Sequence, residues 1–131
     1  MASRKHVLTG SRYEELAGYA RAVIFGDHVW VSGTVGYDFR TGHLPETAEG
    51  QAEQAIATIA WSLAEAGSSL EEVVRVRVFV PDPTDVEAVS GVMKKHFGRA
   101  KPANTTVCSP LAVPECKVEI EVEAMRGSAL P

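Results

Sequence analysis

Residues 117–124 read Lys-Val-Glu-Ile-Glu-Val-Glu-Ala, a strict alternation of apolar and acidic side chains over most of its length. Successive side chains of a β-strand point to opposite faces, so this pattern predicts a strand with one apolar face and one acidic face. The apolar face would carry Val118, Ile120 and Val122, and the acidic face would carry Glu119, Glu121 and Glu123. Because three neighbouring carboxylates repel one another, the acidic face must lie in open solvent or against cationic partners.

Periodicity and turn residues predict the other elements of the chain. The expected strands are 20–25, 28–32, 73–80 and 103–108, and the expected helices are 48–66 and one that ends near Phe97. Gly26-Asp27 indicates a hairpin between the first two strands, and Thr84-x-x-Glu87 matches a capping box before the second helix. The order ββ-α-β-α-ββ predicts an α+β two-layer sandwich, in which two helices cover one face of one mixed sheet.

The strand at 73–80 also has a half-polar face. Alternation places Arg75, Arg77 and Phe79 together on it. If this strand neighbours the glutamate strand, arginines and glutamates can pair across them, each exposed pair contributing about 0.2–1 kcal/mol. Two interpretations of this face stay open, a solvated outer surface and a surface through which copies of the chain associate.

The composition argues against several classes of protein. The 131 residues fit one domain, and 13 basic against 17 acidic side chains give a net charge of -4. No run of Lys or Arg is present, so we expect no nucleic-acid partner. The apolar runs are too short to span a bilayer, and none follows the charged N-terminal residues as a secretory signal would require. We therefore expect no membrane association and a cytoplasmic location.

Cysteine and histidine spacing predicts no metal site. Cys108 and Cys116 are too few for a disulfide framework, and we expect both as small apolar residues at strand ends in a reducing compartment. The four histidines are scattered, with no pair at metal-ligand spacing. We expect neither a metal nor another cofactor.

Five segments, in this order and spacing, resemble the RidA/YjgF family of reactive intermediate/imine deaminases, also labelled endoribonuclease L-PSP. They are Gly18-Tyr19-Ala20-Arg21-Ala22, Val29-Trp30-Val31-Ser32-Gly33, the stretch from Val73 to Asp82, Pro102-Ala103-Asn104-Thr105 and Val118-Glu119-Ile120-Glu121. The resemblance covers about residues 18–125 of a single domain 1–131, with 1–17 as a leading segment. It implies a chorismate-mutase-like fold and a homotrimer with ligand clefts between its subunits.

The resemblance also implies a reaction, the hydrolysis of reactive enamines and imines to a 2-keto acid and ammonia. In the family an arginine within a Pro-Ala-Arg segment binds the substrate carboxylate, and this chain has Asn104 at that position. A hydrogen bond from a charged donor is about 1–2 kcal/mol stronger than one from a neutral donor. The same carboxylate should therefore bind more weakly here, which indicates a divergent member with another ligand, such as a different carboxylate or keto acid.

Other cleft positions carry over by resemblance. Tyr19 matches the cleft tyrosine, Ser32-Gly33 the strand-end backbone and Glu119 the candidate catalytic glutamate that helps to place water; Ser90 replaces an asparagine and Thr106 a cysteine. Each has a plainer interpretation: Tyr19 as a packed aromatic, Glu119 as part of an ion-pair network, Asn104 as a partner of backbone groups and Ser32-Gly33 as the end of a strand.

Two questions stay open at this level. Arg77 is either a counter-charge for the glutamate row or a relocated anchor for an anionic ligand. The chain is expected to form a homotrimer that binds a small metabolite, either as a variant hydrolytic deaminase or as a non-catalytic ligand-binding or regulatory protein. Endoribonuclease activity is a third interpretation, disfavoured by the acidic charge.

Overall fold

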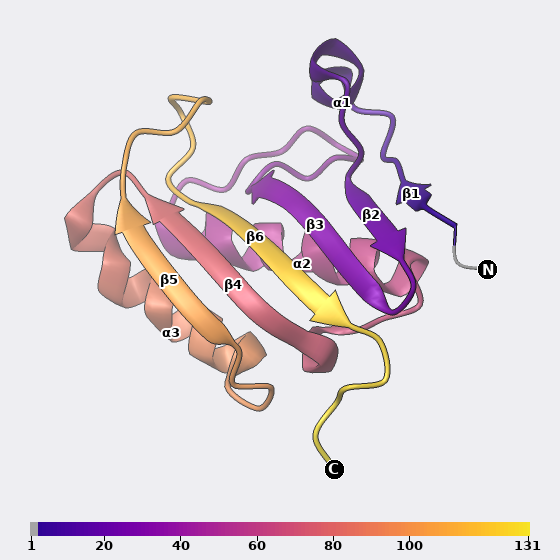
Figure 1. Cartoon of the computed structure of the whole chain (residues 1–131). Coiled ribbons are helices and arrows are strands. Elements are labelled where there is room, and N and C mark those ends of the chain that lie inside the picture. The colour runs from indigo at the N-terminus through magenta and orange to yellow at the C-terminus, as the bar shows by residue number, and fades with distance from the viewer. Residues whose placement is uncertain (1–2) are drawn as a thin grey trace.

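The computed structural model describes residues 3–131 and has one six-stranded sheet at its centre (Figure 1). Its strands are β1 (Lys5–Val7), β2 (Ala22–Phe25), β3 (His28–Val35), β4 (Val73–Val80), β5 (Ala103–Cys108) and β6 (Glu119–Met125). They lie in the order β1-β2-β3-β6-β4-β5, and all pairs are antiparallel except the parallel pair β4–β5. The expected mixed sheet is confirmed.

The helices gather mainly on one side of this sheet. They are α1 (Arg12–Ala17), α2 (Ala48–Glu65) and α3 (Val86–Phe97), with 3-10 turns η1 (Leu70–Glu72) and η2 (Pro83–Asp85). Figure 1 shows α2 and α3 behind the sheet, whereas α1 stands apart at one end. The two-layer α+β sandwich predicted from the element order is confirmed. No helix among residues 3–131 combines the length and the apolar character that crossing a membrane requires.

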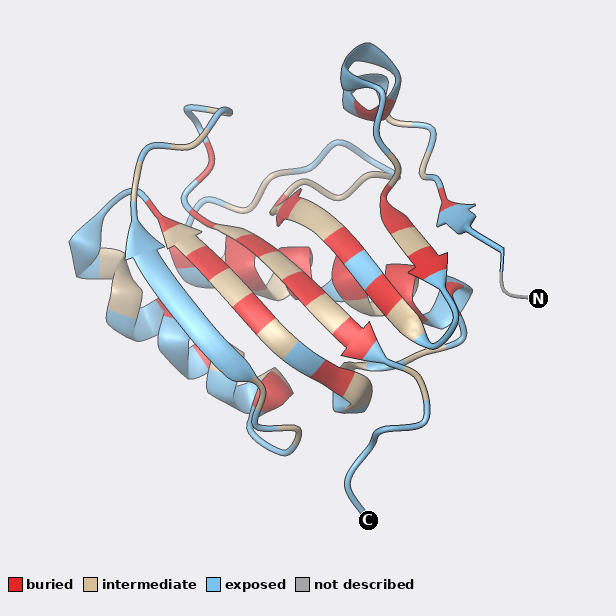
Figure 2. Ribbon diagram, viewed as in Figure 1, coloured by how far each residue is buried: buried red, intermediate tan, exposed pale blue. Residues whose placement is uncertain are grey.

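The core lies between the sheet and α2 and α3. Val76, Val78 and Val80 of β4 are at most 1% exposed, as alternation predicted. Figure 2 shows the same alternation of buried and more exposed residues along β4 and β6. Ile56, Ile59 and Leu63 of α2 are equally buried against them. Burial of each such side chain contributes about 1.5–3 kcal/mol to the stability of the fold. Because this burial requires apolar residues at regular positions, the sequence period predicted these segments.

On the opposite face of the sheet, the arginines of β4 lie beside the glutamates of β6, as predicted. Antiparallel pairing of β4 with β6 sets Arg77 opposite Glu121 and Arg75 opposite Glu123. Arg77 Nη1 lies 3.6 Å from Glu121 Oε1 and 3.4 Å from Glu123 Oε1. Arg75 instead donates a 2.6 Å hydrogen bond to Thr105 Oγ1 on β5. Arg77 alone, rather than both arginines, therefore forms ion pairs with the acidic face of β6, and it contacts two of its three glutamates.

The leading segment contributes structure of its own. Within residues 3–17, β1 pairs with β2 through Val7 and Ala22, and Val7 is 7% exposed. Ser11 Oγ caps α1 by accepting from the amide of Glu14 at 3.2 Å. Met1 and Ala2 lie outside the described residues. Because β1 and α1 are short, neither contains enough residues to produce a readable period.

Three local expectations were wrong. Thr84 and Glu87 form no capping box, because Asp82 Oδ1 accepts from the Thr84 amide at 2.9 Å and builds the turn η2 before α3 begins. Cys108, expected as a small apolar residue at a strand end, does end β5 but is exposed, because β5 is the edge strand. The strand at 28–32 does not end at Gly33 but continues to Val35.

Candidate functional site

A bulge in β3 brings Gly33 against Glu119. Pairing with β6 shifts register between Val31 and Thr34, so Gly33 falls inside the irregularity. A Cβ atom at position 33 would lie 2.8 Å from Glu119 Oε2, closer than real contacts allow. The absence of a side chain therefore lets the half-buried carboxyl group of Glu119 rest over the β3 backbone. Ser32-Gly33 is thus not a strand end, and Gly33 lies against the side chain of Glu119.

Arg21, which directly precedes β2, holds this backbone. Its Nη2 donates a 2.7 Å hydrogen bond to the carbonyl oxygen of Gly33, and the side chain is only 9% exposed. The Cζ atom lies 5.8 Å from the ring centre of Tyr19, and Ser32 Oγ donates to the carbonyl of Ala20 at 2.7 Å. We call Tyr19, Arg21, Ser32, Gly33 and Glu119 the Glu119 cluster.

The charges of the Glu119 cluster favour a carboxyl group that can change its protonation state. Burial raises the pKa of Glu119, and the nearby Glu121 raises it further, while Arg21 opposes both. Burial likewise lowers the pKa of Arg21, but its guanidinium stays protonated in a protein. A carboxyl group whose pKa is raised holds a proton more readily than an ordinary glutamate, which suits it to accept a proton from water and to return it.

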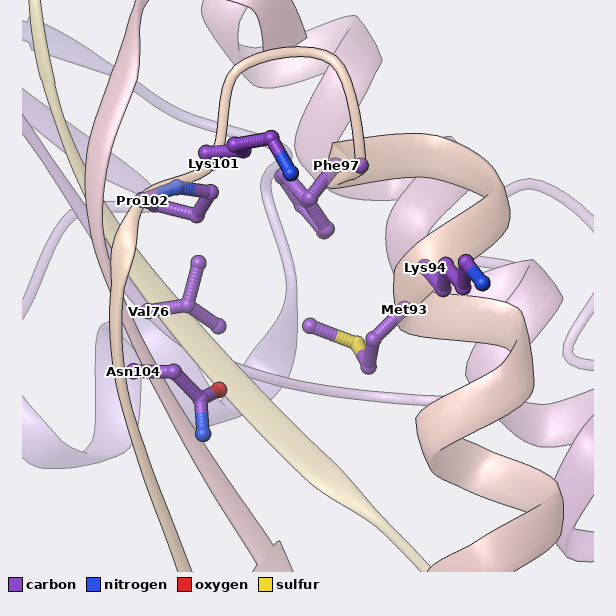
Figure 3. A pocket seen from close by; sticks show the side chains of 8 residues that line it. Val76, Met93, Lys94, Phe97, Lys101, Pro102 and Asn104 are labelled. Atoms are coloured by element: carbon purple, nitrogen blue, oxygen red, sulfur yellow. The ribbon is translucent and has the colours of Figure 1, made fainter.

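The remaining predicted site residues lie on β5 and α3. Asn104 Nδ2 donates a 3.0 Å hydrogen bond to Thr106 Oγ1, and Ser90 is exposed on α3. Asn104 pairs with Val76, so it shares the helix-facing side of the sheet. It borders an open pocket of about 200 Å³ between α3 and β5 (Figure 3). The pocket is lined by Val76, Met93, Lys94, Phe97, Gly98, Lys101, Pro102 and Asn104.

Asn104 and Glu119 do not meet within one chain. They lie on β5 and β6, which flank β4, and two strand spacings amount to about 10 Å. Along β4, Asn104 lies beside Val76 and Glu119 beside Phe79, a further offset of about 10 Å. Val76 and Phe79 also point to opposite faces. The structure therefore brings Tyr19, Ser32, Gly33 and Glu119 together and leaves Ser90, Asn104 and Thr106 elsewhere.

Arg77 belongs to neither group. Its guanidinium is occupied by Glu121 and Glu123, and Glu123 Oε2 also lies 3.5 Å from His28 Nε2. The ring of His28 in turn stacks on Trp30 with centroids 3.7 Å apart. This arrangement favours Arg77 as the counter-charge of the acidic row over Arg77 as a ligand anchor. No group of three or more potential metal ligands (His, Cys, Asp or Glu) is found within residues 3–131.

The Glu119 cluster includes one residue that the sequence did not single out as functional. Arg21 is the one charged side chain in the otherwise apolar segment from Ala20 to Phe25. This isolated charge could have indicated a functional residue, because a charged side chain that is buried with an apolar segment needs a hydrogen-bonding or ionic partner. The partner is the backbone of Gly33, which no local pattern identifies.

Residues 9–126 match the family model described as Endoribonuclease L-PSP. The chain belongs to the RidA/YjgF family. The fold of this RidA/YjgF protein superposes on a crystal structure of a YjgF/YER057c/UK114 family member from Mycobacterium tuberculosis with a TM-score of 0.86 and 35% identity, covering 94% of this chain and 99% of that one. The expected chorismate-mutase-like fold is consistent with such neighbours.

Curated relatives cover nearly the whole of this RidA/YjgF protein. An uncharacterised protein of Streptomyces coelicolor is 34% identical over 95% of this chain and 93% of its own length. The 2-iminobutanoate/2-iminopropanoate deaminase of Capra hircus is 30% identical over 95% of this chain and 91% of its own. The family thus contains proteins named as imine deaminases that match over almost their full length.

Proposed function

We propose that the protein is a homotrimer that binds a small metabolite between its subunits and hydrolyses an imine or enamine there. The separation of Asn104 from Glu119 carries the proposal. Both positions match residues of one cleft in the family, yet they lie on opposite faces of a single sheet. A second copy that sets its Asn104 edge beside the Glu119 cluster would complete one site. All six residues of β5 are exposed and available for such a contact.

The chemistry assigns Glu119 to proton transfer. Water adds to the carbon of the protonated C=N group as Glu119 takes a proton from that water, and the product is a carbinolamine. Glu119 then returns the proton to the carbinolamine nitrogen. As the C–N bond breaks and the C=O bond forms, Glu119 takes the hydroxyl proton, and it passes this proton to the released ammonia, so that a 2-keto acid and ammonium leave. The raised pKa of Glu119 and its place over the Gly33 backbone suit this step.

The neutral Asn104 changes the expected substrate. An amide offers two neutral donors, whereas an arginine offers a charged fork that matches a carboxylate. Simple 2-aminoacrylate-type intermediates should therefore be hydrolysed poorly, and the preferred ligand is another carboxylate or keto acid. The deaminase name of the Capra hircus relative supports the reaction class rather than this substrate.

A non-catalytic ligand-binding or regulatory trimer is the second candidate, and the neutral Asn104 favours it. Endoribonuclease activity has the support of the family model's description alone. The net charge of -4 and the acidic row of β6 disfavour RNA binding.

Ammonia release tests the proposal. A panel of imines is generated in place by a pyridoxal-phosphate enzyme from different amino acids, and ammonia is measured with wild type and with Glu119→Gln. We expect wild type to accelerate release for at least one imine and Glu119→Gln to lose about 10²-fold or more of that rate. Ligand binding without acceleration for any imine would favour the non-catalytic candidate. RNA cleavage that disappears in Glu119→Gln would support the endoribonuclease candidate.

A further inference from the structure

We propose that the pocket between α3 and β5 binds a small monocarboxylic acid with an apolar body, and that Lys101 is its cationic anchor. Binding by this pocket involves residues of one chain alone. Asn104 borders both this pocket and the proposed site between subunits, so the bound acid would also be the substrate. This second statement rests on the proposed function.

The walls of the pocket are apolar. Val76 and Phe97 are 1% and 3% exposed, and the half-buried Met93 packs against the same core and also lines the pocket. Figure 3 shows Val76, Met93 and Phe97 around the space between strand and helix. The volume of about 200 Å³ equals the liquid volume of roughly six or seven water molecules, at about 30 Å³ each. This space suits the hydrocarbon part of a short-chain acid.

The cations near the pocket differ in their partners. Lys95 pairs with Glu53 at 2.8 Å, His96 contacts the same glutamate, and Arg99 pairs with Glu71 at 3.2 Å. Lys94 and Lys101 make no ion pair with any residue of 3–131. In Figure 3 the amine of Lys101 extends from the loop towards Phe97, whereas the amine of Lys94 points away from Asn104. Lys101 is therefore the cation better placed for a ligand.

Lys101 also occupies an unfavourable backbone conformation. Its φ of 49° is the one positive φ of a non-glycine residue among residues 3–131. The Lys101 amide donates to the carbonyl of Phe97 at 2.9 Å and so closes the end of α3. Glycine adopts this left-handed conformation without strain and is common at such helix ends. The backbone thus gives no reason for a lysine, which leaves its side chain as the feature to explain.

Asn104 completes the recognition of a carboxylate. Its Nδ2 carries two N–H donors, and one of them is used by Thr106 Oγ1. In Figure 3 this nitrogen faces away from Lys101, so the Asn104 side chain must rotate before its free N–H can donate to one carboxylate oxygen while the ammonium of Lys101 binds the second. One ammonium and one neutral amide match a single negative charge, which favours a carboxylate over a doubly charged phosphate.

Affinities of a homologous series test the pocket. Calorimetry measures binding of acetate, butyrate and hexanoate to the wild-type protein, with hexylamine as the control of opposite charge. We expect affinity to rise about fourfold for each added methylene until the pocket is full. Hexylamine should bind more weakly than hexanoate because Lys101 repels it. Equal affinity across the acids, or no binding of any acid, would overturn the proposal.

Variants of Lys101 test the anchor. Lys101→Gln should weaken hexanoate about tenfold, Lys101→Arg should largely keep the affinity, and Arg99→Gln, from the same loop, should leave it unchanged. Lys101→Gly should weaken hexanoate equally while raising the melting temperature by about 2–4 °C through relief of strain. Equal effects of Lys101→Gln and Arg99→Gln would contradict the anchor and leave the proposed function standing. If the wild-type protein is a monomer and Lys101→Gln still abolishes binding, the loss of binding supports the anchor and the monomeric mass contradicts the proposed trimer.

Discussion

Arg21 Nη2 donates a 2.7 Å hydrogen bond to the carbonyl oxygen of Gly33, so a buried cation on the segment before β2 fixes the bulged backbone of β3. Glu119 rests over the same glycine. A single contact therefore connects the backbone irregularity to the candidate proton-transfer residue. The geometry of the Glu119 cluster depends on a residue that needs no contact with a ligand.

Substitution of Arg21 should separate positioning from folding. Arg21→Gln leaves the Gly33 carbonyl without its charged donor and should reduce the free energy of unfolding by about 1–3 kcal/mol. It also removes the charge that opposes the raised pKa of Glu119, so the acidic limb of the activity profile should move to higher pH. Urea unfolding and rates against pH measure the two effects. Arg12→Gln, an exposed arginine on α1, is the control and should change neither. A lower stability without a moved pH profile would restrict Arg21 to a structural role.

Glu119 should make stability depend on pH with a defined sign. Its pKa in the folded protein lies above the ordinary value of 4.5, because burial and Glu121 disfavour the charged form. Near pH 4 the group is largely protonated when folded, so Glu119→Gln should change the melting temperature little. Above the folded pKa the wild type carries an unfavourable half-buried charge, and Glu119→Gln should then be the more stable protein.

Melting temperatures at pH 4 and pH 7.5 measure this difference. Glu46→Gln, which removes an exposed loop carboxylate, controls for net charge and should behave alike at both pH values. A Glu119→Gln protein that is less stable than wild type at pH 7.5 would show that Arg21 outweighs burial and Glu121.

The sequence predicts those parts of the fold that rest on period and burial. The bounds Val73–Val80 of β4 follow from its alternating valines, and its neighbour β6 follows from the glutamate row. The contact between Gly33 and Glu119 could not be predicted, because it depends on a register shift between Val31 and Thr34 that leaves no local pattern. Thr84 failed as a cap because Asp82 competes for the same amide, and sequence spacing cannot rank the two.

The sequence predicted which residues belong to the candidate site, but it did not predict how they are arranged in space. Resemblance to the family named Tyr19, Glu119 and Asn104 together. The structure alone shows that Asn104 turns towards the helices while Glu119 lies on the other face of the sheet. Which of these residues share a site is a question of assembly, and assembly depends on surface geometry rather than on the period of one strand.

Restoring a charged anchor should strengthen carboxylate binding. Asn104→Arg supplies a planar donor with a full charge, and we expect it to raise the affinity for 2-ketobutyrate about tenfold. Asn104→Gln is the matched control, because it lengthens the side chain without adding charge. Calorimetric titration measures both. Equal affinities of the two variants would show that position 104 does not contact the carboxylate.

Arg77 should matter for assembly more than for ligand affinity. Arg77→Ala leaves Glu121 and Glu123 without their cation, so three chains would bring uncompensated carboxylates together and the proposed trimer should loosen. Arg75→Ala is the control, since Arg75 bonds Thr105 rather than a glutamate. Sedimentation should give three times 14.1 kDa for wild type and a lower average mass for Arg77→Ala. If Arg77→Ala keeps its mass and loses affinity for 2-ketobutyrate, Arg77 is the ligand anchor instead.

Mixed assemblies test most directly whether a second chain completes the site. Glu119→Gln removes the proton-transfer group, and Asn104→Asp places a repelling charge at the carboxylate position. Each variant alone should lack deaminase activity, but co-expressed chains should form some sites that combine Glu119 of one subunit with Asn104 of another. Random mixing predicts recovery of about a quarter of the wild-type rate of ammonia release. If the co-expressed variants recover nothing although each assembles normally, Glu119 and Asn104 do not complete a site between chains.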